Sequence, residues 1–261
     1  MTTDQQHTTQ VRLPDGREVA CDHAEEVPAL WDEIVRNSPF PAAVDAIRPG
    51  DTIIDVGAHI GLVSMFLADR LPDTRILAFE PASRTHACLL RNFAAHVPNG
   101  IASATALSDR TGNQEFHYYP DNPSMSTLYV DHDDDAHNLG TYLTNLGVPE
   151  IKPAEVRAVT EKRAALSDTV GTSTLTTVIE EQGVTDIGLL KIDVERAELT
   201  VLDGMRADLW PRVRQVVVEV HDLDGRLGVV VARLATLGYE VRVSQAPAFR
   251  GASVYLLFAG R

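Results

Sequence analysis

The chain has 261 residues, of which 44% are hydrophobic and 23% charged, as in ordinary globular proteins. Its net charge of −14 disfavours a nucleic-acid or anionic-membrane partner, because phosphate binding needs clustered lysine and arginine. The N-terminus does not resemble a signal peptide, and no apolar run approaches the roughly 20 residues of a membrane span. Cys21 and Cys88 show no metal-like spacing. We expect a soluble cytoplasmic protein, either a monomer or a homo-oligomer.

The first part of the chain predicts a small covering unit. Residues 1–10 have the composition of a disordered tail, residues 11–20 that of a hairpin turning at Asp15-Gly16, and residues 25–37 that of a helix. We therefore expect residues 1–45 to form an N-terminal tail, hairpin and helical cap on a domain that spans residues 46–261.

Strand and helix patterns alternate from residue 52 onwards. Strands are expected at 52–56, 75–80, 101–107, 187–192 and 213–220, with helices at 60–71, 83–96 and 225–237. Two closing strands, 239–243 and 253–258, complete the pattern. The alternation predicts an α/β fold with a mostly parallel sheet, helices on both faces and an antiparallel last strand.

Residues 119–174 interrupt this alternation with polar sequence. An insertion of this length is more often a lid or binding element than a bare loop, so we expect a substrate lid at about residues 120–172. The acidic run at 131–135 includes His132 and precedes His137; metal binding by these histidines is one interpretation, and a solvated acidic loop is the favoured one. Ser124 and Ser126, just before the run, either donate hydroxyls to cofactor or substrate or cap a turn.

The segment DVGAHIG at residues 55–61 predicts a strand end, a tight turn and a helix start. Its glycines allow a ligand to approach the backbone, but a histidine occupies the place of the middle glycine in dinucleotide folds. That bulk argues against an NAD-dependent oxidoreductase. S-adenosylmethionine carries an ammonium and a carboxylate, which suit an acid at the strand end and a helix N-terminus. The expected cofactor-binding residues are Asp55, Gly57, Ala58, His59 and Gly61; in the alternative interpretation the glycines only allow tight packing.

The next strand ends at Glu80-Pro81, 25 residues after Asp55. An acid at this spacing hydrogen-bonds the ribose diol in nucleotide-binding α/β folds, and Pro81 ends the strand. The third strand is followed by Ser108 and Asp109. These two residues either reach the adenine edge of the cofactor or belong to an ordinary turn.

Charged residues follow the buried strand 187–192 abruptly. Alternation places Lys191, Asp193 and Glu195 on one face, at the edge of the sheet where such folds bind ligands. Burying these charges is unfavourable unless they pair or take part in chemistry. We expect Lys191 and Asp193 to be catalytic, Asp193 also to contact the cofactor, and Glu195 to contact the substrate. The alternative is a Lys191–Asp193 ion pair, with Glu195 and Glu198 opening a helix.

Glu219 and His221 share a face at the end of the following strand. Imidazole has an ordinary pKa of about 6.5 and accepts a hydroxyl proton at neutral pH. We expect His221 to be the catalytic base, oriented by Asp193 or Glu219, and Glu219 to contact the substrate. A buried histidine with a purely structural role is the alternative. Asp193, Glu219 and His221 would also suit Mg²⁺, although nothing in the sequence requires a metal.

Together these motifs resemble the FkbM family of methyltransferases. The resemblance lies in DTIIDVGAHIG (51–61), ILAFEP (76–81), ALSD (106–109), SMSTL (124–128), LLKIDVERAELTVLDG (189–204) and VVVEVHD (216–222). It implies a Rossmann-like class I methyltransferase fold of seven strands and S-adenosylmethionine as cofactor. It also implies methyl transfer to oxygen on a polyketide, macrolide, peptide or sugar, as in antibiotic biosynthesis and other secondary metabolism.

Two positions depart from the family pattern. Arg196 stands where the family has glycine in KIDVEGAE, and His59 stands where it has asparagine. Arg196 is expected at the mouth of the substrate pocket, where it fills space, pairs with Glu195 or Glu198, or binds an anionic substrate group. We expect an O-methyltransferase for a small-molecule hydroxyl; the alternatives are N-methylation and a catalytically silent cofactor-binding module, which the intact set of acids disfavours.

Overall fold

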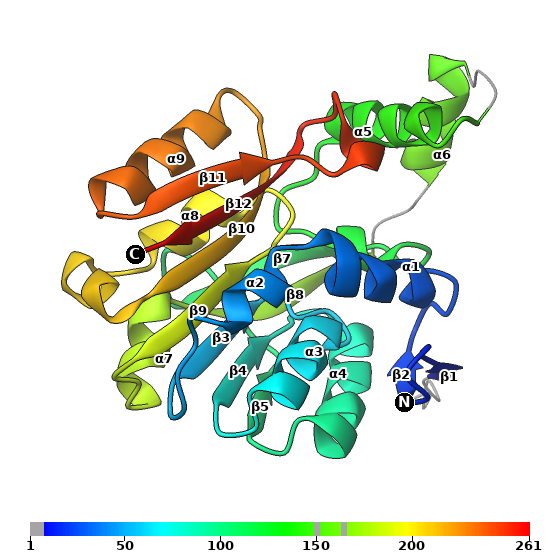
Figure 1. Cartoon of the computed structure of the whole chain (residues 1–261). Coiled ribbons are helices and arrows are strands. Elements are labelled where there is room, and N and C mark those ends of the chain that lie inside the picture. The colour runs from blue at the N-terminus through cyan, green and yellow to red at the C-terminus, as the bar shows by residue number, and fades with distance from the viewer. Residues whose placement is uncertain (1–7, 149–151, 163–165) are drawn as a thin grey trace.

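The computed structural model describes residues 8–148, 152–162 and 166–261. Its main sheet has seven strands in the order β11–β12–β10–β9–β3–β4–β5 (Figure 1). Their bounds are β3 Thr52–Val56, β4 Arg75–Phe79, β5 Gly100–Ser103, β9 Ile187–Ile192, β10 Gln215–His221, β11 Glu240–Ser244 and β12 Val254–Gly260. β12 pairs antiparallel with β10 and β11, whereas β5, β4, β3, β9 and β10 pair in parallel. The expected fold class is confirmed.

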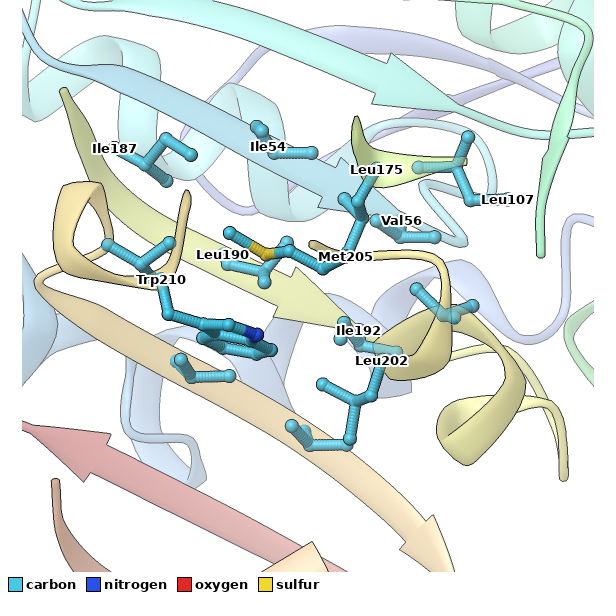
Figure 2. Close-up of a cluster of buried hydrophobic side chains, with 14 of the residues drawn as sticks. Ile54, Val56, Leu107, Leu175, Ile187, Leu190, Ile192, Leu202, Met205 and Trp210 are labelled. Atoms are coloured by element: carbon cyan, nitrogen blue, oxygen red, sulfur yellow. The ribbon is translucent and has the colours of Figure 1, made fainter. Parts of the chain in front are cut away.

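Alternating side chains of the strands divide the apolar residues into two cores, one on each face of the sheet. Ile54, Leu190 and Trp210 belong to the first core, which Figure 2 shows in part. Ile53 and Leu189 point into the second core. The first core is covered by α7 (Leu175–Glu181), α8 (Glu198–Asp203), η3 (Ala207–Arg212) and α9 (Arg226–Thr236); the second is covered by α3 (Leu62–Arg70) and α4 (Ser83–His96). Strand β9 is buried on both faces, as its continuous apolar sequence predicts.

The N-terminal segment packs onto the second core. Strands β1 (Thr9–Arg12) and β2 (Glu18–Cys21) form the predicted antiparallel hairpin, so the predicted tail is wrong for residues 9 and 10; residues 1–7 lie outside the described part of the chain. The predicted helix is observed as α1 (Val27–Asp32) and the π-helical turn η1 (Glu33–Asn37), followed by α2 (Phe40–Val44). Val27 and Trp31 are buried in the second core. The domain division at residue 45 stays a prediction.

Residues 101–107 do not form the single strand that their sequence predicts. β5 ends at Ser103, and β6 (Ala106–Leu107) leaves the main sheet. It pairs with β8 (Leu166–Ser173), which also pairs with β7 (Gly112–Tyr118) in a three-stranded sheet. The hydrophobic pattern of residues 101–107 predicts one strand because both halves of the segment suit a strand. The crossing from one sheet to the other depends on tertiary packing, which the local pattern does not record.

The segment between β7 and β8 forms η2 (Pro123–Met125), α5 (His132–Asn145) and α6 (Pro153–Lys162). Figure 1 shows α5 and α6 together, outside the sheet. Asp131 caps α5, because its carboxylate accepts the backbone N–H groups of Asp133 and Asp134. Asp134 and Asp135 are 6% and 3% exposed. The interpretation of this run as a solvated acidic loop is therefore wrong.

Candidate active site

A cavity of about 650 Å³ lies at the carboxyl ends of β3, β4, β9 and β10. Its walls also include residues of α1, η1, η2 and α5. Open α/β sheets bind their ligands at this edge. The turn after β3 and the end of β4 border one part of the cavity, and the acidic ends of β9 and β10 border another. The expected cofactor and substrate residues therefore largely meet in one space.

The turn after β3 is built so that it packs tightly against the loop after β9. Gly57 has φ +75°, and a Cβ atom there would lie 1.7 Å from the carbonyl oxygen of Asp193. The N–H groups of Gly57 and Ala58 donate to the carbonyl of Phe79 at 3.0 and 2.9 Å. Gly57, Ala58 and His59 line the cavity. Gly61 is not part of the lining; it has φ +90° and packs against Leu89, so its position supports the packing interpretation.

Lys191 closes the space beneath this turn. Its ammonium lies 3.2 Å from Asp55 and 3.3 Å from Asp193, and it donates to the carbonyl of Gly57 at 2.5 Å. Burial lowers the pKa of Lys191, but Asp55 and Asp193 outweigh that effect and raise the pKa above its ordinary value. A lysine held charged in this way is no proton acceptor, so the arrangement supports the ion-pair interpretation of Lys191.

Asp55 is enclosed behind the cavity wall rather than facing a ligand. It is fully buried, accepts a hydrogen bond from the hydroxyl of Ser64 at 2.7 Å, and does not line the cavity. A direct contact between Asp55 and the cofactor ammonium does not fit this arrangement, whereas a contact through water stays a prediction. Asp55 instead holds Lys191, which in turn holds the turn and Asp193.

Glu80 does lie at the cavity, at the end of β4. Its Oε2 accepts the N–H of His59 at 3.0 Å and its Oε1 accepts the N–H of Ala82 at 2.9 Å. Each carboxylate oxygen has a second lone pair with which to accept a hydroxyl. Burial raises the pKa of Glu80, although both N–H groups oppose the shift. Pro81 also lines this part of the cavity.

An apolar surface suited to an adenine ring continues from Glu80. It is lined by Phe79, Ala106, Leu107 and Phe116. Sequence reasoning missed these residues, because the crossing from β5 to β6 is what brings them here. Ser108 and Asp109 do not line the cavity: Ser108 is fully buried, and Asp109 pairs with Arg110 at 3.3 Å. Their position supports the alternative of an ordinary turn.

His221 ends β10 with a carboxylate beside each ring nitrogen. Nδ1 lies 3.2 Å from Oδ2 of Asp134, and Nε2 lies 3.1 Å from Oε2 of Glu195. The Nε2 contact is not aligned as a hydrogen bond, so this buried nitrogen has no hydrogen-bond partner among the described residues. The expectation that Asp193 or Glu219 orients His221 is wrong: Asp193 pairs with Lys191, and the carboxylates that contact the ring nitrogens belong to Asp134 of α5 and Glu195.

The charges around His221 set its protonation. Burial alone lowers the pKa of His221, but Glu195, Asp134 and Glu198 outweigh it and hold the pKa well above its ordinary value. Burial, Asp193 and Glu195 together raise the pKa of Glu219 well above its ordinary value. Glu219 lines the cavity, and its carboxyl group has no hydrogen-bond or ion-pair partner within the described ranges. An unpaired, half-buried carboxyl group at the cavity surface is available to a ligand.

The cap contributes acids that the sequence analysis missed. Glu33 of η1 lines the cavity, and burial, followed by the charge of Asp193, raises its pKa. Glu26 lies 3.3 Å from Nε2 of His59 and accepts a hydrogen bond from Ser124 at 3.2 Å. A π-helical turn such as η1 is frequent at functional sites, but it has no sequence signature that would have identified Glu33.

Ser124 of η2, Ser126 just after it, and Arg196, which replaces the glycine of the family pattern, have defined partners. Ser126 accepts the N–H of Tyr119 at 3.2 Å and lines the cavity together with Ser124. The guanidinium of Arg196 pairs with Asp134 and Asp135 of α5 rather than with Glu195 or Glu198. Pairing with two carboxylates leaves no net charge for an anionic substrate group.

Two groups of three side chains among the described residues have a metal-like spacing. Glu195, Glu219 and His221 form one, and Asp22, Glu26 and His59 form the other, with ligand atoms within 4.8 Å of one another in each. Asp193 belongs to neither, so the possible Mg²⁺ set of Asp193, Glu219 and His221 is wrong in one residue, because Glu195 takes the place of Asp193. The comparisons with known proteins give no support for Mg²⁺. Within the described ranges, no helix is long and apolar enough to cross a membrane.

The strand order, the antiparallel last strand, the glycine turn and the acid after β4 together define a class I methyltransferase. The family model for the methyltransferase FkbM domain matches residues 55–241. The chain is 40% identical to 31-O-demethyl-FK506 methyltransferase FkbM of Streptomyces tacrolimicus over 96% of both chains, and 32% identical to methyltransferase sdnD of Sordaria araneosa over 72% of this chain and 73% of that one. A crystal structure of methyltransferase FkbM from Methylobacillus flagellatus has the same fold, with 13% identity and a TM-score of 0.50 over 89% of this chain and 58% of that one.

The chain therefore belongs to the FkbM methyltransferase family and is an S-adenosylmethionine-dependent methyltransferase. It also matches AMB antimetabolite synthetase AmbE of Pseudomonas aeruginosa, at 32% identity over 97% of this chain but 12% of that longer protein. The residues present suit the cofactor: Glu80 offers acceptors for a ribose diol, the surface around Leu107 is apolar, and the acids of the cavity suit a sulfonium and an ammonium.

Proposed function

We propose that this enzyme methylates a hydroxyl group of a small-molecule natural product, in secondary metabolism and in the cytoplasm. The observation that carries the proposal is the buried Nε2 of His221 at the cavity, which lies 3.1 Å from Glu195 and makes no aligned hydrogen bond with any described residue. An alcohol must lose its proton as the new bond to carbon forms, so a base beside the acceptor is the feature that oxygen methylation needs. The name of the relative from Streptomyces tacrolimicus, a 31-O-demethyl-FK506 methyltransferase, supports an oxygen acceptor.

S-adenosylmethionine, when bound, supplies a methyl group already activated by the positive sulfur. The chain supplies the binding contacts: Glu80 for the ribose and the backbone of Gly57, Ala58 and His59 at the turn. Asp193, held by Lys191, lies where the turn after β3 meets the loop after β9. Asp193 therefore lies between the part of the cavity proposed for the cofactor and the part lined by the acids of β9 and β10.

The acceptor site is proposed between β9, β10, η1 and α5. Glu219 and Glu195 accept hydrogen bonds from hydroxyl groups of the substrate, while apolar residues such as Leu139 and Tyr142 of α5 contact its carbon skeleton. Ser124 and Ser126 add hydroxyls at η2. Holding the acceptor in line with the methyl group and excluding water provide most of the rate enhancement.

Proton removal falls to the neutral form of His221. With Nδ1–H donated to Asp134, the lone pair of Nε2 is available for the proton of the acceptor hydroxyl. Glu195 then lies beside the newly formed imidazolium and stabilises its positive charge. No step of this proposal uses a metal ion.

N-methylation is the second candidate, because Glu33, Asp193, Glu195 and Glu219 together favour a cationic amine. Methyl-labelled S-adenosylmethionine should be incubated with the enzyme and pairs of acceptors that differ only in a hydroxyl or an amine at one carbon. We expect labelled methoxy products, and a rate about 100- to 10,000-fold lower for His221→Ala with S-adenosylhomocysteine affinity unchanged. N-methyl products alone, or full activity of the variant, would overturn the proposal.

A further inference from the structure

Helix α5, in the segment predicted to be a lid, places a side chain directly beside His221, the proposed base. Asp134 reaches Nδ1 of His221 at 3.2 Å, although 87 residues separate the two in sequence. Its second oxygen accepts a hydrogen bond from the hydroxyl of Ser253, the residue before β12, at 2.6 Å. Burial raises the pKa of Asp134, but His221, Ser253 and Arg196 outweigh it and hold the pKa below its ordinary value. Asp134 is therefore a charged acceptor inside the protein.

The side chain of Arg196 binds the same turn of α5 through Asp134 and Asp135. Its Nε donates to Asp134 at 3.1 Å, and its terminal nitrogen pairs with Asp135. Arg196 is 4% exposed and has φ +77°, directly after Glu195 with φ +51°. Two consecutive non-glycine residues with positive φ angles, in the left-handed region, are strained. Such backbone strain persists only where surrounding contacts hold it. The paired guanidinium supplies such a contact.

The contacts of Glu195 complete the connection between the lid segment and the catalytic loop. Thr127, which follows η2, donates its hydroxyl to the carbonyl of Glu195. The backbone N–H of Arg196 donates to Glu198 at 2.7 Å, and Arg226 donates to the carbonyl of Arg196 at 3.0 Å. The insertion and the loop after β9 therefore share one network around His221.

We propose that Asp134 is the positioning residue of His221, and that Arg196 holds it in place when α5 lies against the catalytic loop. The inference rests on the proposed function in that His221 is the base. A neutral imidazole has two tautomers, and the group that accepts one ring N–H decides which nitrogen keeps its lone pair. Asp134 selects the tautomer whose Nε2 accepts a proton in the cavity. The charged groups that face His221 are Asp134 from α5, Glu195 from the loop after β9, Glu198 from α8 and Glu219 from β10.

Asp134 and Asp135 form a matched pair for a test. Both carboxylates pair with Arg196, but only Asp134 contacts His221. In Asp134→Asn we expect kcat to fall about 100-fold, as expected for a misplaced catalytic group, with the KM for S-adenosylmethionine unchanged. In Asp135→Asn we expect a much smaller loss of kcat. Equal losses in both variants would assign Asp134 to lid docking alone and overturn the proposal.

Nitrogen NMR of the imidazole ring gives a readout that does not depend on turnover. The signals of His221 are assigned by their absence in His221→Gln. We expect the wild-type enzyme to carry the Nδ1–H tautomer above the pKa of His221, and Asp134→Asn to lose that preference and to show a lower pKa. If the tautomer is unchanged in Asp134→Asn, the proposal fails, whichever acceptor the enzyme methylates; if hydroxyl methylation fails but the tautomer shifts, only the proposed function is lost.

A second variant covers the case in which Asp134→Asn does not fold. Arg196→Gly relieves the strain of the positive φ angle and removes the guanidinium without touching His221. We expect α5 to exchange its amide protons faster and the Nδ1–H tautomer of His221 to be less populated. Unchanged exchange and an unchanged tautomer in this variant would contradict the role of Arg196.

Discussion

The ammonium of Lys191 lies 3.2 Å from the carboxylate of Asp55, and both side chains are buried between the central strands β9 and β3. This pair joins the two motifs that carry the family resemblance, DVGAHIG and KIDVE. It holds the glycine turn through the carbonyl of Gly57 and holds Asp193 at the cavity. The pair therefore shapes the active site from beneath: Lys191 lines the cavity and Asp55 lies behind its wall.

Replacing Lys191 by methionine should destabilise the fold. The substitution keeps most of the side-chain volume but leaves Asp55 as a buried charge without its partner, which costs about 3–5 kcal/mol. Urea unfolding followed by circular dichroism measures the change. Arg206→Met removes an equally charged group whose ion pairs are on the surface, and its midpoint should stay close to wild type. A Lys191→Met midpoint as high as that of this control would show that the buried pair contributes little.

Gly57→Ala should abolish cofactor binding. The added Cβ atom would lie 1.7 Å from the carbonyl oxygen of Asp193, and the φ angle of +75° disfavours any L side chain. Either the turn after β3 or the loop after β9 must move, and the backbone of the turn can then no longer bind the cofactor. Calorimetric titration with S-adenosylhomocysteine measures the effect. Gly228→Ala in α9, where the added atom meets nothing within 4 Å, should bind normally and stabilise the protein by about 0.4–1 kcal/mol. Normal binding by Gly57→Ala is the result that contradicts this account.

Glu80→Gln should weaken S-adenosylhomocysteine binding about 10- to 100-fold. The change replaces a charged acceptor for the ribose diol by a neutral amide, and hydrogen bonds to charged groups contribute about 1.5–3 kcal/mol. It also removes one of the two oxygens that accept the N–H groups of His59 and Ala82. Titration calorimetry is the measurement, with Glu181→Gln on the exposed side of α7 as control. Equal affinities of the two variants would remove Glu80 from the cofactor site.

The activity should rise with pH through a pKa above the ordinary histidine value. His221 must be neutral to accept a proton, and Glu195 and Asp134 hold its pKa up despite burial. Activity is therefore low below that pKa and reaches its plateau at alkaline pH. In Glu195→Gln the negative charge beside Nε2 is lost, so the rising limb of the kcat profile should move to lower pH. Thr169→Val on strand β8, which contributes no residue to the cavity lining, should leave the limb unchanged. A limb that does not move in Glu195→Gln would exclude His221 as the titrating group.

Several features of the site could be predicted because they depend on local sequence. The glycine turn, Glu80 at the end of β4 and the charges after β9 and β10 follow from strand alternation and from the rule that ligands bind at the carboxyl edge of the sheet. The same reasoning placed Asp55 in contact with the cofactor, since an acid at a strand end faces the edge. Ser64 and Lys191 enclose it instead, and neither contact has a sequence signal.

The sequence by itself determined the fold class and the edge of the sheet at which the site lies, because hydrophobic periodicity and glycine positions act within a few residues. Only the tertiary structure decided which carboxylate meets which ring nitrogen. Asp134 reaches His221 because the acidic run forms a helix that packs back across the sheet edge, and Leu107 reaches the cavity because the chain changes sheets. Such contacts join residues far apart in the chain, and their formation depends on packing and on pairing of buried charges rather than on any local pattern.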